Sequence, residues 1–107
     1  MKRYGSVIKV VPEKFEEYKQ LHAAVWPVVL KMIKKCNIRN YSIYYKDGYL
    51  FGYYEYTGNN YAADMAKMTA DPETQRWWSV CKPCQQPLQN REPGEWWASM
   101  KEIFHSD

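Results

Sequence analysis

The sequence has little of what disulfide and metal chemistry need, since its 107 residues include two histidines and three cysteines. An odd number of cysteines argues against a disulfide framework. Cys81 and Cys84 have the C-x-x-C spacing of redox and zinc motifs, but they follow a predicted helix, whereas a helix N-terminus is what lowers a thiol pKa. No second pair is present to complete a zinc site. We therefore interpret this spacing as chance within a helix-terminating turn.

Long hydrophobic runs and blocks of one charge are also missing. No segment approaches the roughly 20 apolar residues of a membrane span, and the apolar run near the N-terminus is too short and interrupted for a signal peptide. We therefore expect a cytoplasmic protein with no membrane partner. The net charge is +3, and the longest basic cluster, Lys31, Lys34 and Lys35, fits the solvent face of a helix. No basic stripe alternates with aromatic residues, so we expect no nucleic-acid partner.

Aromatic residues, in contrast, are abundant, with ten tyrosines and five tryptophans. Tyrosine and tryptophan combine a large contact area with a polar tip. Their surplus suits a polar ligand with apolar faces, although core packing also uses such residues. The length fits one domain over residues 1–107 with a single modest core.

Hydrophobic periodicity predicts the order strand, helices, strand, strand, helices, strand. Asp47-Gly48 is a strong hairpin signal between the second and third strands. Asp71 and Pro72 suit the N-cap and first position of a helix. The predicted elements are a strand over 4–11, a helix from Pro12 that Pro27 interrupts before it ends near Cys36, strands over 39–45 and 49–56, a helix from Tyr61, a helix from Asp71, a loop over 83–94 and a strand over 95–104.

This order predicts an α+β fold of the ferredoxin-like split β-α-β type, in which an antiparallel sheet carries helices on one face. In the strand over 39–45, Tyr41, Ile43 and Tyr45 should share one face of the sheet. The sheet face without helices would expose many aromatic side chains. A symmetric dimer that packs two such sheets together is the simplest way to cover it.

His22 is the first candidate for chemistry, because it lies on the inward stripe of its predicted helix. Tyr18 precedes it and Trp26 follows it by four residues, so the three could form one patch. An imidazole titrates near neutral pH and can both give and take a proton. The pattern alone leaves a second interpretation open, in which His22 is a histidine at the core edge whose ring bonds a backbone carbonyl.

Aromatic side chains provide the other candidates. Trp77 and Trp78 are adjacent on a helix, so they point about 100° apart; one could anchor the helix while the other walls a pocket. Packing of both in the core remains open. Tyr41 could face core or pocket, and the local pattern does not select it over Tyr44 or Tyr45.

A set of short motifs makes the sequence resemble the L-rhamnose mutarotases. The resemblance extends from Val7 to about Trp78, and more loosely to Phe104. The matching pieces are Glu17-Tyr18 followed by His22, Val25-Trp26-Pro27, Asn40-Tyr41-Ser42-Ile43-Tyr44 and Gln75-Arg76-Trp77-Trp78.

The resemblance implies an enzyme that interconverts the α and β anomers of L-rhamnose or a related 6-deoxyhexose. It implies that His22 is the general acid, that Tyr18 and Tyr41 bind substrate hydroxyls, and that Trp77 and Trp78 form the wall that faces the sugar. It also implies a homodimer, with a dimeric α/β barrel assembly, and no metal or organic cofactor. The monosaccharide would be the only ligand the reaction needs.

Residues after 83 depart from the family pattern, and a loop there could reshape the pocket edge. Such a change could move the preference toward L-fucose. Two alternatives of other classes stay open. One is a dimeric ferredoxin-like protein that binds haem through His22, and the other is a purely structural dimer in which His22 only contributes to stability.

Overall fold

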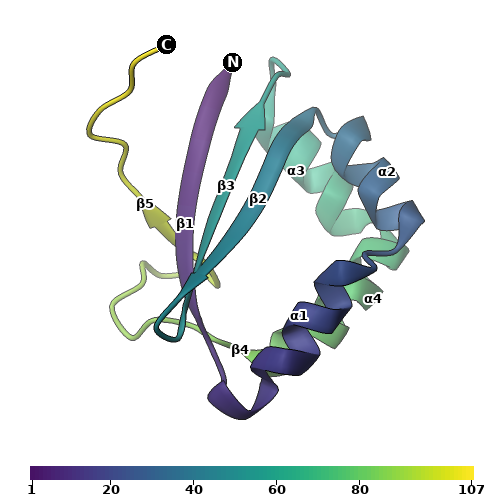
Figure 1. The fold of residues 1–107 in the computed structure, drawn as a ribbon. Helices are drawn as coiled ribbons and strands as arrows, with labels where there is room; N and C mark the ends of the chain where they lie inside the picture. Colours follow the sequence, from purple (N-terminus) through teal and green to yellow (C-terminus); the bar gives the residue numbers. More distant parts are fainter.

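The computed structural model describes residues 1–107, which form one curled antiparallel sheet covered on one face by helices (Figure 1). The order of elements confirms the predicted α+β class with four α-helices. In chain order the elements are β1 (Lys2–Val10), the 3-10 helix η1 (Pro12–Lys14), α1 (Phe15–Ala23), α2 (Pro27–Lys35), β2 (Ile38–Lys46), β3 (Tyr49–Tyr56), α3 (Tyr61–Ala70), α4 (Pro72–Cys81), the 3-10 helix η2 (Lys82–Cys84), β4 (Gln85–Gln86) and β5 (Ala98–Met100).

Strand β1 is central in the sheet order β2-β3-β1-β4. One edge of β1 pairs with β3 along nearly its whole length. The other edge pairs with β4 at Lys9–Val10 and with β5 at Gly5–Val7. The two short strands therefore share the place of a fourth strand, and the segment 87–97 leaves the sheet between them.

The alternation of side chains along the strands determines which of them are buried in the core. Ile8 and Val10 of β1 point to the helical layer and are buried there, together with Leu50 of β3. One cluster connects the sheet to α1, α2 and α4, which positions these helices over it. Its members are Ile8, Val10, Tyr18, Val29, Leu50, Trp77, Cys81 and Cys84.

Two local signals in the sequence are confirmed. Asp47 and Gly48 have φ angles of 50° and 88°, as a two-residue turn between β2 and β3 requires. Asp71 caps α4, since its carboxylate accepts hydrogen bonds from the backbone N–H and the hydroxyl of Thr74 at 3.0 and 2.7 Å. Both signals involve residues that are close together in the sequence, so each depends little on contacts with distant parts of the chain.

Strand β2 contains a bulge that the sequence did not indicate. Arg39 pairs with Glu55 and Ser42 pairs with Tyr53, so β2 has one extra residue in this interval. Asn40 sits there with a φ of 52°, and its side-chain amide donates to Glu55 at 2.7 Å. The alternation predicted for Tyr41, Ile43 and Tyr45 holds despite the bulge. Tyr41 and Ile43 line the cavity described below, and Tyr45 stacks on Phe15 of α1.

The predicted first helix is split differently from expectation. Pro12 opens the short turn η1 and α1 begins only at Phe15, because Val11 provides no side-chain cap. Pro27 does not kink a continuous helix; it occupies the first position of α2, which its fixed φ suits.

The predicted last strand over 95–104 is wrong in its bounds. Only Ala98–Met100 pairs with β1, because Trp96 and Trp97 turn into the helical side of the sheet. After Met100 the chain has no further strand pairing; Glu102 forms an ion pair with Arg3 of β1 at 2.7 Å, while Ile103 and Phe104 are exposed (Figure 1). The predicted loop over 83–94 is also interrupted, since it holds the end of η2 and all of β4.

The sheet face opposite the helices is uncovered in the single chain, as expected. Tyr44, Tyr49 and Met100 are all exposed there. None of the helices is both long and apolar enough to cross a membrane.

Candidate active site

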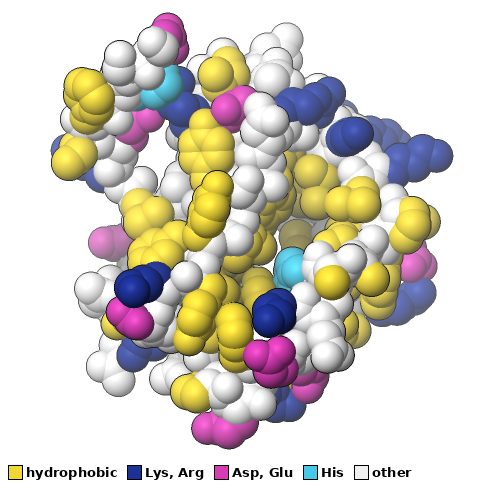
Figure 2. All heavy atoms as spheres, viewed as in Figure 1, with side chains coloured by type: hydrophobic (Ala, Val, Ile, Leu, Met, Phe, Trp, Pro, Cys, Tyr) yellow, Lys and Arg dark blue, Asp and Glu magenta, His cyan; other side chains and the backbone are white.

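A cavity of about 550 Å³ lies between the curled sheet and the helices. This volume is within the range of small-molecule sites. The hollow opens to solvent in Figure 2, where a histidine side chain forms part of its wall among hydrophobic neighbours. Fourteen of its 22 lining residues are hydrophobic, so the walls are mainly apolar with a limited set of polar groups.

All five residues predicted for the site line this one cavity. Tyr18 and His22 come from α1, Tyr41 from β2, and Trp77 and Trp78 from α4. The structure therefore brings together three segments that are far apart in sequence. The part that each residue takes in binding or catalysis remains a prediction.

His22 is held in one orientation by its own helix. Its Nδ1 lies 2.9 Å from the backbone oxygen of Tyr18, and a carbonyl can only accept, so Nδ1 carries the proton. The ring stacks on the Tyr18 ring at 4.2 Å between centroids and meets the Trp77 ring edge-on at 5.3 Å. This hydrogen bond is the one foreseen for a structural histidine, but the same ring also faces the cavity.

Burial keeps His22 in its neutral form. It lowers the pKa of His22 below its ordinary value, and the hydrogen bond to the Tyr18 carbonyl only partly opposes this. The imidazole is therefore neutral at pH 7, with Nε2 as a free acceptor. The resemblance implies a general acid, but this ring must first take a proton before it can give one.

Tyr18 is buried at 4% exposure, and its hydroxyl belongs to a chain of hydrogen bonds. Gln85 Nε2 donates to the Tyr18 hydroxyl at 3.1 Å, and Trp96 Nε1 donates to Gln85 Oε1 at 2.7 Å. Burial raises the pKa of Tyr18 far above its ordinary value. The phenol therefore stays protonated over the whole physiological range.

The structure selects Tyr41 among the tyrosines of β2. Tyr44 points to the uncovered sheet face with 67% exposure, and Tyr45 packs on Phe15. Tyr41 remains 46% exposed because it borders the open cavity, with its ring 5.3 Å from that of Tyr54. Enclosure of its hydroxyl by the cavity walls raises the pKa of Tyr41 to about 12, so it too is a hydrogen-bond donor.

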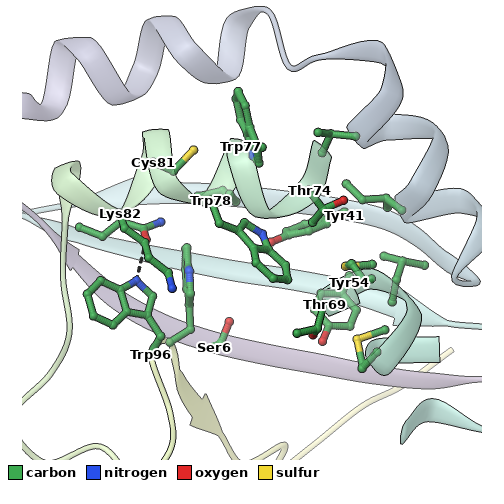
Figure 3. A pocket seen from close by; sticks show the side chains of 18 of the residues that line it. Ser6, Tyr41, Tyr54, Thr69, Thr74, Trp77, Trp78, Cys81, Lys82 and Trp96 are labelled. Carbon is green, nitrogen blue, oxygen red and sulfur yellow. Dashed lines mark hydrogen bonds between the residues drawn. The ribbon is translucent and has the colours of Figure 1, made fainter. Parts of the chain in front are cut away.

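The two tryptophans of α4 diverge as their helical spacing predicts. Trp77 is 6% exposed and packs edge-on against Trp26 at 5.2 Å, so it anchors the helix to the core. Trp78 is half-buried and lies on the side of α4 that faces the sheet and Tyr41 (Figure 3). Trp26 does not join the predicted patch: α1 ends at Ala23, and Trp26 packs behind Trp77 instead.

Several cavity residues have no signal of their own in the sequence. The pattern predicts a strand for Trp96 and Trp97 and a loop for Gln85, but all three line the cavity. Lys82 places its ammonium 5.3 Å from the centroid of the Trp96 ring at the same end of the cavity (Figure 3). The surplus of tryptophan was the one available signal, and it did not indicate which ones line a pocket.

The C-x-x-C cysteines lie in the core. Cys81 and Cys84 are buried free thiols. Burial raises the pKa of Cys81 to about 12, and it also raises the pKa of Cys84, whose sulfur contacts Glu17 at 3.6 Å. A redox-active pair needs the opposite shift. No three His, Cys, Asp or Glu side chains stand close enough to hold a metal ion.

The fold and the site together define an α+β protein with an aromatic-walled cavity, one neutral imidazole and phenol donors. Such groups suit proton transfer on a small polar molecule with apolar faces.

Comparison with known proteins supplies the family. Residues 3–106 match the family model described as L-rhamnose mutarotase. An L-rhamnose mutarotase from Oceanobacillus iheyensis is 32% identical over 109 residues, with all of both chains covered. One from Bacillus subtilis is also 32% identical with full coverage of both. The chain therefore belongs to the L-rhamnose mutarotase family.

A solved structure supports the fold. The crystal structure of an L-rhamnose mutarotase from Formosa agariphila superposes with a TM-score of 0.79 and covers all of both chains. The two sequences are 18% identical, so this match bears on architecture alone.

Proposed function

We propose that this chain is an isomerase that interconverts the α and β anomers of L-rhamnose by general acid–base ring opening and closure. The observation that carries the proposal is the neutral His22 imidazole, which faces an aromatic cavity with Nε2 unprotonated. Family membership gives the sugar, and the geometry gives groups able to move the protons the reaction needs.

The proposed reaction takes a proton from one oxygen of the sugar and delivers it to another. His22 Nε2 takes the proton of the anomeric hydroxyl, the bond between the anomeric carbon and the ring oxygen breaks, and the His22 imidazolium gives the proton to the ring oxygen. The resulting aldehyde rotates, and the reverse steps close the ring on its other face. General acid–base catalysis contributes about 10²–10⁴-fold to such a reaction. The phenols of Tyr18 and Tyr41 stay protonated, so they suit hydrogen-bond donation to sugar oxygens.

The aromatic walls fit the substrate class. Trp78, with Trp96 and Trp97, offers flat apolar surface to the C–H faces and the methyl group of a 6-deoxyhexose. Polar side chains, among them His22 and Tyr41, line the same cavity and can meet the sugar hydroxyls. Trp77 supports this wall from the core side.

Exchange spectroscopy tests the proposal. Saturating the α-anomer signal of L-rhamnose should transfer saturation to the β signal at a rate that rises with protein concentration. L-fucose, measured in parallel, reports the preference for the sugar. Absence of acceleration with both sugars overturns the proposal, and a His22-dependent Soret band with haemin favours a haem-binding protein instead.

The oligomeric and cellular settings belong to the same proposal. We propose a ferredoxin-like split β-α-β arrangement in which two copies pack their uncovered sheet faces into a dimeric α/β barrel assembly, within the cytoplasm. The exposed Tyr44, Tyr49 and Met100 support this arrangement. Tyr44→Asp and Tyr49→Asp together should convert a dimer to a monomer in sedimentation velocity. A parent chain that sediments as a monomer would exclude the dimer.

A further inference from the structure

The hydrogen-bond chain at one end of the cavity has a defined direction. An indole N–H can only donate, so the atom of Gln85 that Trp96 meets at 2.7 Å must be the amide oxygen. The other end of the same amide is then the NH₂ group, which can only donate. It lies 3.1 Å from the Tyr18 hydroxyl, so Gln85 donates and Tyr18 accepts.

This direction determines where the Tyr18 proton points. The hydroxyl uses a lone pair for Gln85, and no protein acceptor takes its own hydrogen. Tyr18 lines the cavity, so the hydrogen is available to a molecule bound there. Without Gln85 in this orientation, the hydroxyl could equally present a lone pair to the substrate.

The surroundings hold Gln85 in place. Its backbone pairs with Val10 in the two-residue strand β4, which fixes the position of the side chain beside α1. Trp96 reaches it from the segment between β4 and β5, and the Lys82 ammonium lies over the Trp96 ring. Figure 3 shows Trp96, Lys82 and the hydrogen bond that Trp96 donates grouped at one end of the cavity.

We infer that Gln85 is a positioning residue that sets the Tyr18 hydroxyl as a hydrogen-bond donor to an oxygen of the bound sugar. The inference rests on the proposed mutarotase function. It extends the site to a residue of β4 that acts through the Tyr18 hydroxyl, and it gives Trp96 the role of orienting Gln85.

Two substitutions of similar size to glutamine distinguish an effect on the direction of the Tyr18 hydrogen bond from a general loss of structure. Gln85→Glu at pH 8 keeps an acceptor for Trp96 but places a second acceptor against Tyr18, which draws the Tyr18 proton away from the cavity. Gln85→Met removes both hydrogen bonds and leaves the Tyr18 proton free. We expect kcat/KM for anomer exchange to fall about 10- to 100-fold in Gln85→Glu, because the sugar loses the hydrogen bond from Tyr18 and meets an acceptor in its place. In Gln85→Met we expect a fall of only about 3-fold.

A merely structural Gln85 predicts the opposite order, because Gln85→Met loses more contacts than Gln85→Glu. That order would overturn the inference. In a Tyr18→Phe background, Gln85→Glu should change kcat/KM by less than about 2-fold, since the hydroxyl it acts through is gone. If Gln85→Glu still lowered kcat/KM about 10- to 100-fold in the Tyr18→Phe background, that result would also contradict the inference.

The controls keep these outcomes distinct. Activity in the parent chain establishes the proposed function independently of any change at Gln85. Thermal unfolding checks that each variant folds. If Gln85→Glu fails to fold, Trp96→Phe replaces it: its loss of kcat/KM must shrink in the Tyr18→Phe background, and an undiminished loss refutes the role of Gln85.

Discussion

Gly52 forms part of the sheet under the cavity, and a substitution that adds a side chain there should affect both the stability of the fold and the binding of the sugar. A Cβ at this position would lie 3.1 Å from Ser6 Oγ and 3.3 Å from an atom of the Trp97 ring. Both distances are shorter than ordinary contacts. The small serine hydroxyl can rotate, but the flat Trp97 ring has to shift, and it lines the cavity.

The expected magnitude follows from two opposing effects. Overpacking costs about 1–3 kcal/mol, and replacing glycine by alanine at an ordinary φ stabilises by about 0.4–1 kcal/mol through the unfolded state. Gly52→Ala should therefore lower the free energy of unfolding by about 1 kcal/mol, which corresponds to roughly 4–8 °C in Tm for a domain of this size. KM for the sugar should rise as Trp97 moves.

Gly5→Ala is the matched control, because Gly5 lies on β1 next to Ser6, the partner of Gly52, and faces the opposite side of the sheet. Its Cβ would meet the flexible end of Met100 at 3.2 Å, which can rotate away. Calorimetry should show no loss of Tm for Gly5→Ala, and KM should stay at the parent value. Equal effects of the two substitutions, or a gain of stability in Gly52→Ala, would refute this reasoning.

Two further predictions concern His22 and the tryptophan pair. Because burial lowers the pKa of His22, protonation is resisted in the folded chain; the free energy of unfolding and kcat/KM should both decrease as pH falls from 6.5 through that lowered pKa. Chemical denaturation across pH checks this, and an unchanged pH dependence of stability in His22→Ala contradicts it. Trp77→Ala should cost about 3–5 kcal/mol of stability as a buried anchor. Trp78→Ala should mainly raise KM for the sugar. If Trp78→Ala instead destabilised the fold and Trp77→Ala raised KM, the positions assigned to the two tryptophans would be wrong.

Local signals explain what the sequence predicts well. The Asp47-Gly48 turn and the Asp71 cap depend on neighbours within three residues, and the structure confirms both. The pairing of Tyr18 with His22 follows from helical spacing alone. The divergence of Trp77 and Trp78 has the same origin.

Long-range contacts explain what the sequence does not show. Gln85 meets Tyr18 across 67 positions of the chain, and no periodicity signals a two-residue strand. The bulge at Asn40 depends on pairing with Glu55 of the next strand. The predicted last strand is too long because Trp96 and Trp97, which favour strands by composition, pack into the cavity.

The rate of anomer exchange in His22→Ala tests the central claim most directly. His105→Ala is the matched control, since it removes the other histidine, which lies in the C-terminal tail and does not line the cavity. We expect His22→Ala to fold normally and to lose about 10²–10⁴-fold in kcat for L-rhamnose, while His105→Ala keeps the parent rate. A folded His22→Ala chain that exchanges the anomers as fast as the parent would contradict the account.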